Sequence, residues 1–394
     1  MVSFYGNKRG LMNRKLLILS TGFALFSMFF GSGNLVFPIT VGQQSEGHFL
    51  LAALGILLTG VVVPLLGVLG MMLYKGSIKN FFSSLGGVGT FVFSFGALAL
   101  MGPFGVLARC FTVAHGAVEG LLPSLPLVVT SFVFCLAIYL TTIKKNTVIP
   151  MLGSILTPLL LTAIAAIAFF AFQGDAPVAV VMHKVGGWNA FKNGFFQGYQ
   201  TMDLLAAFFF SVFVIQHLQS AKKQETTEKG YLKIFLQSAG LGGGVLAAVY
   251  TVLVVLGHKY APSLSSLAPQ EMLRHIAGQT LGSMAAPCLC VLIVLACFTT
   301  AIVLASLFSD FLQKEVLKGK VNHHVSMIIT LAIGFFVSTL GFSGIARFLG
   351  PVLEVVYPAL IMLTLVNIAH KFWGVKNSHW PVTLTFVARL CMAI

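Results

Sequence analysis

Long apolar stretches, separated by short polar or basic segments, recur along the whole chain. A stretch of about eighteen or more apolar residues predicts a transmembrane helix. The predicted spans cover roughly 15–40, 49–74, 89–122, 125–142, 149–172, 194–218, 231–257, 280–312, 324–342 and 346–370, and an eleventh begins at 381. Because barrel strands would alternate in polarity, this pattern predicts an all-α polytopic membrane protein.

The last predicted span is short. Only 14 residues lie between position 381 and Ile394, whereas a helix needs about twenty to cross a bilayer. We therefore expect that 381–394 is part of an eleventh helix and that the sequence stops inside it. The predicted organisation is a single transport domain over 1–394, with one repeat at about 15–172 and a second at about 194–370.

Two spans are interrupted by polar residues and glycines. Span one contains FFGSGNLVFP (Phe29 to Pro38), and span six contains FFQGYQTMD (Phe195 to Asp203). Irregular backbone at membrane depth survives only where it lines a cavity or is buried in protein. Interruptions at corresponding positions of two halves are typical of transporters built from inverted repeats. The alternative is that the glycines serve close helix packing.

A broken membrane helix offers complementary ligands. The N-terminus of one half exposes N–H groups and suits a carboxylate, while the C-terminus of the other half exposes carbonyls and suits a small cation. An α-amino acid and a cation are therefore a natural pair of ligands, and the surrounding Phe, Leu and Val residues favour an apolar side chain. We predict that Phe30–Asn34 and Gly198–Asp203 form one substrate site.

Several charged residues lie inside predicted spans, and Asp203, Glu354 and Arg109 are the strongest candidates for a role there. Asp203 in span six costs roughly 2.5–3.5 kcal/mol on insertion scales, so we expect it to bind a substrate amine, a cation or a proton, or to accept structural hydrogen bonds. Glu354 in span ten is a second functional candidate. Arg109 in span three either pairs with an acid or caps carbonyls, which is a structural role. Glu119 and Asp310 lie near span ends and are expected at the interface between membrane and water.

Span eight contains the pair Thr299 and Thr300. A threonine in a membrane helix commonly bonds back to a carbonyl of its own helix, but its hydroxyl also suits Na⁺, a hard cation. Span five, 151–172, has no lysine that would replace a bound Na⁺ by a fixed charge. The absence of this lysine favours Na⁺ over H⁺ coupling, although Asp203 could still provide coupling to protons.

Composition and charge agree with a membrane protein. The chain is 57% hydrophobic and only 9% charged, against roughly 25% charged residues in soluble domains. The net charge of +14 does not indicate nucleic acid, because the Lys and Arg residues sit in short loops. With a cytoplasmic N-terminus, 17 of these 24 residues lie inside and 5 outside, as the positive-inside rule requires. The six cysteines are expected to be buried free thiols, and no cofactor is expected.

Four stretches of the chain have a distinctive pattern: FFGSGNLVFP with GQQSEGHFLLAALGILLTGVVVPLLG, MGPFGVLAR (101–109), GSILTPLLL (153–161) and FFQGYQTMDLLAAFFFSVFVI (195–215). Together they resemble the branched-chain amino acid:cation symporter family of bacteria. This chain departs from the family pattern in having Ala108 before the arginine and Gln200 in the span-six motif. Members normally have twelve spans, so the sequence also departs by ending early.

The resemblance implies a LeuT-like 5+5 inverted repeat with broken helices 1 and 6, within the amino acid–polyamine–organocation superfamily. It implies uptake of Leu, Ile and Val with Na⁺ or H⁺ across the bacterial inner membrane. The implied substrate-binding residues are Phe30, Gly31, Ser32, Gly33, Gly198, Tyr199, Gln200, Thr201 and Asp203. The implied cation ligands are Ser27, Phe30, Asn34, Thr299 and Thr300.

The sequence therefore predicts a secondary active symporter that works by alternating access. A passive channel would need a continuous polar stripe or charged rings, whereas the polar residues here cluster near the midplane. A membrane enzyme or scaffold is disfavoured, because no span contains a nucleophile–base pair or metal motif. A truncated, non-transporting relic of the same fold is the remaining alternative if the natural chain ends at Ile394.

Overall fold

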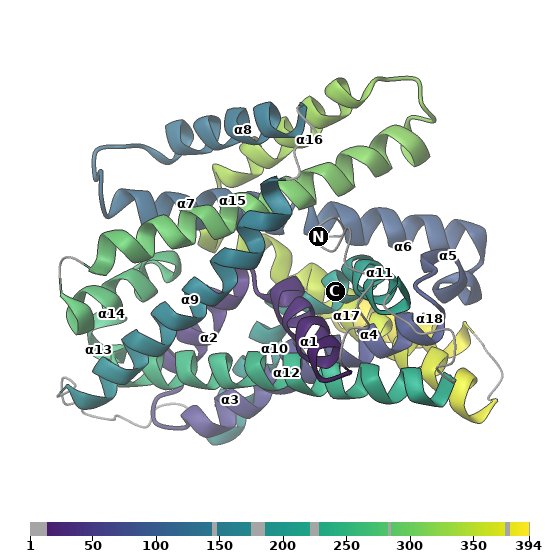
Figure 1. Cartoon of the computed structure of the whole chain (residues 1–394), viewed down its shortest axis with the longest axis horizontal. Coiled ribbons are helices and arrows are strands. Elements are labelled where there is room, and N and C mark those ends of the chain that lie inside the picture. Colours follow the sequence, from purple (N-terminus) through teal and green to yellow (C-terminus); the bar gives the residue numbers. More distant parts are fainter. Residues whose placement is uncertain are drawn as a thin grey trace.

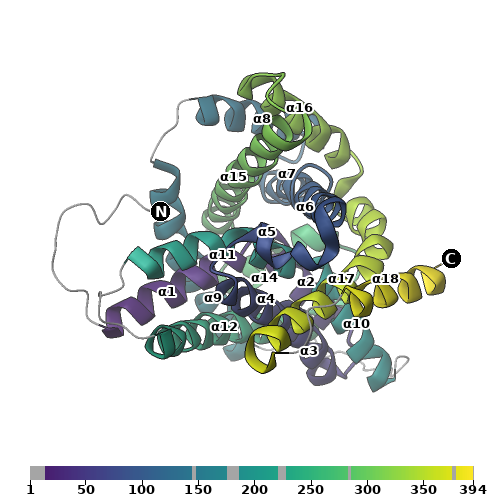
Figure 2. The same cartoon turned by 90° about the vertical axis from the view of Figure 1, so that its right-hand side faces the viewer.

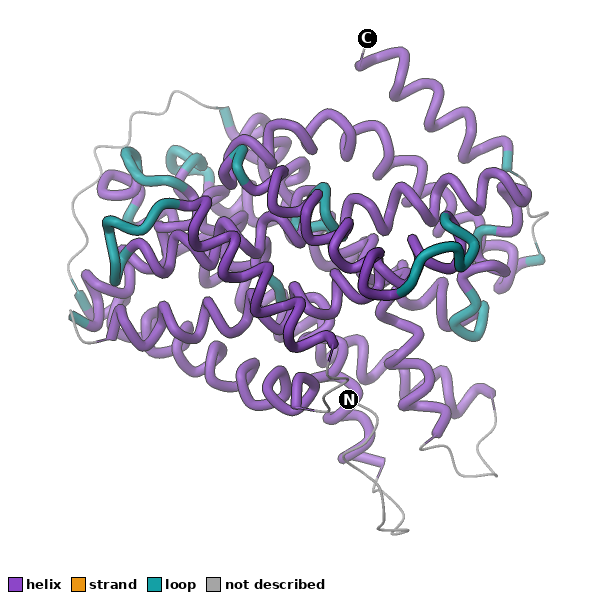
Figure 3. The backbone as a smooth tube through the Cα atoms, turned by 90° about the horizontal axis from the view of Figure 1, so that it is seen from above, coloured by secondary structure: helices purple, strands orange, loops and turns teal. Residues whose placement is uncertain are grey.

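The computed structural model describes residues 14–143, 148–174, 186–220, 228–282, 285–374 and 379–393. Within these ranges the backbone consists of helices and connecting loops, without strands (Figure 3). The elements are α1 (Arg14–Phe29), α2 (Ser32–Gln43), α3 (Phe49–Leu57), η1 (Leu58–Val62), α4 (Val63–Leu73), α5 (Ile78–Phe81), η2 (Ser83–Leu85), α6 (Gly86–Met101), α7 (Val106–Glu119), α8 (Leu127–Ile143), α9 (Val148–Gln173), α10 (Gly187–Gln200), α11 (Asp203–Ser220), α12 (Glu228–Lys259), α13 (Ala261–Leu264), η3 (Pro269–Glu271), α14 (Met272–Leu281), α15 (Ala285–Phe311), η4 (Leu312–Val316), α16 (His323–Ser338), α17 (Gly341–Trp373) and α18 (Trp380–Ala393).

Every predicted span corresponds to a helix or a helix pair. Among the described residues, five helical segments are long and apolar enough to cross a membrane, and counting each of two bent pairs as one span raises the number to seven. The five are Phe49–Leu73, Ser83–Glu119, Gly230–Lys259, Pro287–Val316 and Gly341–Trp373. Predicted spans four, five, nine and eleven appear as shorter apolar helices, at Leu127–Thr142, Thr157–Gln173, His323–Ser338 and Trp380–Met392.

The two bent pairs are the two spans whose sequences are interrupted. Arg14–Phe29 meets Ser32–Gln43 at 72°, and Gly187–Gln200 meets Asp203–Gln216 at 40°. The prediction of broken helices in spans one and six is therefore confirmed. In each case a residue with a short or polar side chain stands at the point where the regular ladder of hydrogen bonds stops.

Span three contains a further interruption that the sequence analysis treated as continuous helix. The helix stops at Met101 and resumes at Val106, with a turn over 102–105 between them. Pro103 has no N–H to donate to a helical carbonyl. A Cβ on Gly105 would lie 2.0 Å from the carbonyl oxygen of Leu100, so only glycine fits this turn.

Boundaries differ at spans nine and ten. The predicted spans meet between 342 and 346, whereas α16 ends at Ser338 and α17 begins at Gly341. The helix α17 then continues through Pro351 and Pro358 to Trp373. The apolar pattern could not place this boundary, because the turn itself is made of apolar and small residues.

The broken helices lie at the centre of the bundle, between two groups of packed helices. One group contains α3, α4 and α12, and the other contains α7 and α15; α8 and α16 lie side by side at one edge (Figures 1 and 2). Close approach of α2 and α12 requires glycine on both: a Cβ on Gly42 would lie 1.9 Å from the Val254 oxygen, and one on Gly257 2.1 Å from the Ile39 oxygen. Small residues at helix contacts are typical of membrane bundles.

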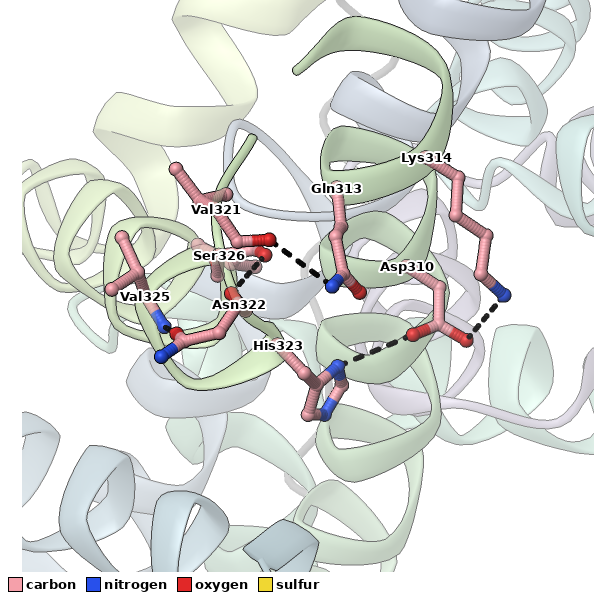
Figure 4. Close-up of polar contacts among 9 residues, drawn as sticks. Asp310, Gln313, Lys314, Val321, Asn322, His323, Val325 and Ser326 are labelled. Atoms are coloured by element: carbon pink, nitrogen blue, oxygen red, sulfur yellow. Dashed lines mark hydrogen bonds and ion pairs between the residues drawn. The ribbon is translucent and has the colours of Figure 1, made fainter. Parts of the chain in front are cut away.

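Asp310 lies near the end of α15, where the chain turns toward α16. Its carboxylate is 3.3 Å from Nδ1 of His323 and 3.8 Å from Nζ of Lys314 (Figure 4). Asn322 caps α16 by accepting a hydrogen bond from the Val325 N–H at 2.9 Å. The Asp310 side chain is half exposed. Its basic partners and its exposure agree with the predicted location at a span end.

Candidate functional site

The first break is formed by Phe30 and Gly31. Gly31 is extended, with φ −122° and ψ −168°, and α2 begins at the next residue. Its N–H group, which has no carbonyl partner within a helix, donates to Oδ1 of Asn34 at 3.2 Å. Such a bond from a side chain one turn along satisfies one of the free N–H groups at a helix N-terminus.

The second break is formed by Thr201 and Met202. Met202 has φ +61°, in the left-handed region that non-glycine residues seldom adopt. Such a conformation costs of the order of 1–3 kcal/mol and is found mainly at functional sites. The Thr201 hydroxyl donates to the Gly198 carbonyl at 2.9 Å, and Asp203 begins α11.

Asn34 and Asp203 join the two breaks directly. Nδ2 of Asn34 donates to Oδ2 of Asp203 at 2.8 Å, and the Tyr250 hydroxyl donates to the same oxygen at 2.9 Å. Nδ2 of Asn34 also donates to the Tyr250 hydroxyl. The Asn34 and Asp203 side chains are each about 2% exposed, and that of Tyr250 is fully buried. Among the described residues, no Lys, Arg or His forms an ion pair with Asp203.

Tyr250 was missed by the sequence analysis. It lies on α12 in the otherwise apolar run LAAVYTVLVV (246–255). A buried tyrosine hydroxyl usually has a hydrogen-bond partner, so a lone tyrosine in the middle of span seven was an available signal. What the sequence could not give was the identity of that partner, because Tyr250 and Asp203 are 47 positions apart.

A cavity of about 50 Å³ lies between the breaks. Its lining combines backbone and polar groups of the breaks with apolar side chains from α6, α7, α11 and α15. The lining residues are Ser27, Met28, Phe29, Phe30, Gly31, Ser32, Gly33, Asn34, Met101, Val106, Arg109, Thr201, Met202, Asp203, Ala206, Phe210, Thr300 and Leu304.

Most of the predicted ligands line this cavity. They include the predicted substrate-binding residues Phe30, Gly31, Ser32, Gly33, Thr201 and Asp203 and the predicted cation ligands Ser27, Phe30, Asn34 and Thr300. The Ser27 hydroxyl is also 3.3 Å from the Thr157 hydroxyl of α9, so span five contacts span one beside the cavity. The roles of these residues stay predictions, but the structure brings them to one place.

Four predicted residues lie outside the lining. Gly198 packs against α3 and η1, where a Cβ would lie 2.0 Å from the Thr59 hydroxyl. The Tyr199 ring lies 4.7 Å from that of Tyr357. Thr299 donates to the Ala296 carbonyl at 3.1 Å, which is the internal bonding considered as its alternative role.

The fourth such residue is Gln200, which is bound by Arg109. The Arg109 guanidinium donates to the Gln200 carbonyl at 2.6 Å and also to its side-chain oxygen. Arg109 thus caps a carbonyl at the end of α10, one of the two roles predicted for it. Glu354 lies on an exposed face of α17, and its backbone carbonyl accepts a hydrogen bond from Nε of Arg389 at 3.3 Å.

The protein-family comparison identifies the chain. A family model described as "Branched-chain amino acid transport protein" matches residues 14–394. The chain belongs to this family. It is 30% identical over 360 residues to the branched-chain amino acid permease BrnQ of Corynebacterium glutamicum, covering 90% of this chain and 81% of that protein. It is 28% identical over 363 residues to BrnQ of Escherichia coli K12, with the same coverage. The resemblance inferred from the four motifs is therefore confirmed.

Solved structures confirm the LeuT-like fold. The inward-facing conformation of Mhp1 aligns with a TM-score of 0.60 at 12% identity, covering 96% of this chain and 89% of Mhp1. The complex of MhsT with L-phenylalanine aligns with a TM-score of 0.56 at 14% identity, covering 98% of this chain and all of that chain. The chain is thus a multi-pass membrane transporter of branched-chain amino acids with two broken helices at its centre.

Proposed function

We propose that the chain is a secondary active symporter that imports Leu, Ile and Val together with Na⁺ or H⁺ by alternating access. The observation that supports this most directly is the pair of helix breaks joined through Asn34 and Asp203. Asp203 is a buried carboxylate with two neutral donors and no basic partner among the described residues. Burying an isolated negative charge is costly, so a bound cation, a proton or a substrate ammonium group would stabilise the site.

The proposed substrate site has parts for each end of an amino acid. The N-terminus of α2, at Ser32 and Gly33, supplies N–H groups and a partial positive charge for the carboxylate. Asp203, which also lines the cavity, is the proposed partner for the ammonium group. The apolar lining residues Val106, Phe210 and Leu304 would contact a branched side chain.

The proposed cation site lies at the other side of the first break. Ser27, Phe30, Asn34 and Thr300 all line the cavity, and each carries an oxygen atom of the kind that suits Na⁺. Thr299 contributes to this proposal only if its hydroxyl leaves the Ala296 carbonyl. Coupling by H⁺ would instead use Asp203 as the group that gains and loses the proton.

Alternating access is supported by the size of the cavity. A volume of about 50 Å³ is well below the roughly 300–1,000 Å³ of ligand pockets, and it suits a bare ion or water. A substrate must then enter through a state in which the halves of the broken helices have moved apart.

The basic loops favour a cytoplasmic N-terminus in the inner membrane.

The test is uptake by the purified chain in proteoliposomes. Labelled leucine should accumulate above its external concentration under an inward Na⁺ gradient or an inward H⁺ gradient. It should not accumulate when the concentrations of both ions are equal on the two sides of the membrane. Unlabelled Ile and Val should compete, whereas Lys and Glu should not. Leucine that merely equilibrates, whatever gradient is imposed, would contradict symport.

A further inference from the structure

Arg109 is a buried cation of span three that contacts three other spans. It lies on α7 in span three, and its side chain is only about 1% exposed. Among the described residues, no acidic side chain forms an ion pair with it. A buried charge without a counter-ion depends on the groups that surround it, so those groups show what Arg109 does.

One set of contacts holds the end of α10. The guanidinium donates to the carbonyl and the side-chain oxygen of Gln200, and Nε2 of Gln200 donates to the Ala346 carbonyl of α17 at 3.2 Å. No basic residue of α10 lies in its own last turn. Arg109 therefore supplies from a neighbouring helix the positive charge that a helix C-terminus favours, and Gln200 extends the connection to span ten.

A second set of contacts holds α2. The guanidinium carbon lies 5.0 Å from the ring centroid of Phe37 on α2 and 5.8 Å from that of Phe342 on α17. The two rings are themselves 5.4 Å apart. Cation–π contacts are strongest where water is excluded, as here. Arg109 is thus enclosed by α2, α10 and α17. Separation of these helices from α7 would expose the guanidinium to water.

We propose that Arg109 is a latch that closes one entrance to the site by holding α2, α10 and α17 against α7. This inference rests on the proposed alternating access, in which α2 and α10 are the outer halves of the two broken helices. The latch has two stable arrangements. In one, Gln200, Phe37 and Phe342 enclose the guanidinium; in the other, the helices have parted and water solvates it. It is a positioning residue that acts through the helix halves and need not touch the substrate.

Cys110 provides a reporter within the chain. It follows Arg109, is fully buried, and its Sγ lies 3.5 Å from the Ser32 hydroxyl at the start of α2. Movement of α2 away from α7 would expose this thiol. Intact cells that express the full chain should be treated with a membrane-impermeant maleimide, and the modification of the peptide that contains Cys110 should be measured by mass spectrometry over time.

Cys110 of Arg109→Gln should be modified about tenfold faster than that of the parent chain, because loss of the desolvated cation–π contacts favours the open state, and a factor of ten corresponds to about 1.4 kcal/mol. Phe342→Leu, which leaves Arg109 in place, should give a smaller acceleration, and Arg109→Lys should fall between Arg109→Gln and the parent. Arg389→Gln is the matched control. Arg389 lies on α18 and donates a hydrogen bond to the Glu354 carbonyl on the exposed face of α17, so its variant should react at the parent rate.

The latch is wrong if both Arg109→Gln and Phe342→Leu react at the parent rate. It is also wrong if Arg109→Gln raises the KM for leucine without changing the labelling, because Arg109 would then be a substrate ligand. Failure of the proposed symport has a separate signature, namely absence of gradient-driven leucine uptake by the parent chain. Since labelling does not depend on uptake, the two results are independent.

Discussion

The two helix breaks differ in the charges that the protein itself supplies. At the second break, Arg109 caps the carbonyl end of α10, and Asp203 stands at the amino end of α11. At the first break, α1 has no basic residue in its last turn and α2 has no acidic residue in its first turn. Each end of the second break thus has the charge that its helix dipole favours.

This difference indicates where ligands belong. Among the described residues, Arg109 is the only basic one that lines the cavity, and it is bound to Gln200. No charged side chain lies in the last turn of α1 or in the first turn of α2, so we propose that the first break binds the cation and the carboxylate. The second break mainly supplies the protein's own charged side chains, Arg109 and Asp203, around those ligands. The following experiments test this division.

The largest effect is expected from Asp203→Asn, which removes the fixed negative charge of the second break while retaining its shape. We expect the rate of leucine uptake to fall at least about 100-fold, equivalent to about 3 kcal/mol of lost interaction with a bound charge. Initial rates in proteoliposomes measure this.

Asp310→Asn is the matched control for that change, because Asp310 is half exposed near a span end. It should alter uptake less than about twofold, since exposed ion pairs contribute little. Equal losses in both variants would remove the special role given to Asp203.

The second effect concerns the space at the first break. A Cβ on Gly31 would have only ordinary contacts, the nearest being Asn34 Oδ1 at 3.8 Å. Gly31→Ala should therefore fold and retain uptake, whereas Gly31→Leu should project a large side chain into the region of the cavity. We expect leucine binding by Gly31→Leu to weaken at least roughly tenfold, as overpacking costs about 1–3 kcal/mol. Equal binding by both variants would place the substrate elsewhere.

The third effect separates two neighbouring hydroxyls on α15. Thr300 lines the cavity, whereas Thr299 donates to the Ala296 carbonyl. Thr300→Ala should raise the half-saturating Na⁺ concentration about fivefold, corresponding to one ligand worth about 1 kcal/mol, and Thr299→Ala should change it less than twofold. The measurement is leucine uptake as a function of Na⁺. The opposite order would assign the cation to Thr299.

The smallest effect on substrate affinity is expected at Gly198. A Cβ there would lie 2.0 Å from the Thr59 hydroxyl and 3.0 Å from the Gly60 nitrogen. Gly198→Ala should lower the stability of the detergent-solubilised protein by about 1–3 kcal/mol and leave the KM for leucine nearly unchanged. Gly240→Ala, at a position with open space, is the control for stability. A raised KM with unchanged stability would restore Gly198 to the substrate site.

The sequence predicted the breaks well because each disrupts a local pattern. Glycines, polar residues and an aspartate inside apolar spans are visible without knowledge of any contact. The break at Gly102–Gly105 was missed because its neighbours Met101, Phe104 and Val106 are apolar, so hydropathy continues across it. The span-nine boundary was misplaced for the same reason.

The residues that line the cavity were predicted by segment more reliably than individually. Thr201 and Asp203 reach the cavity, whereas Gly198, Tyr199 and Gln200 of the same motif face other helices. The helical turn of α10 distributes adjacent residues around its axis, so their partners depend on which helix lies on each side. Tyr250 reached the site through α12, and no local pattern linked it to Asp203.

By itself the sequence determined the membrane class, the spans, the two broken helices and the family, because hydropathy and motifs are local properties. Only the tertiary structure decided which polar groups meet. It placed Asn34, Asp203 and Tyr250 in contact, directed Arg109 to Gln200 rather than to an acid, and left the first break without built-in charge. These outcomes depend on how distant helices pack, and packing is set by side-chain shape across the whole bundle.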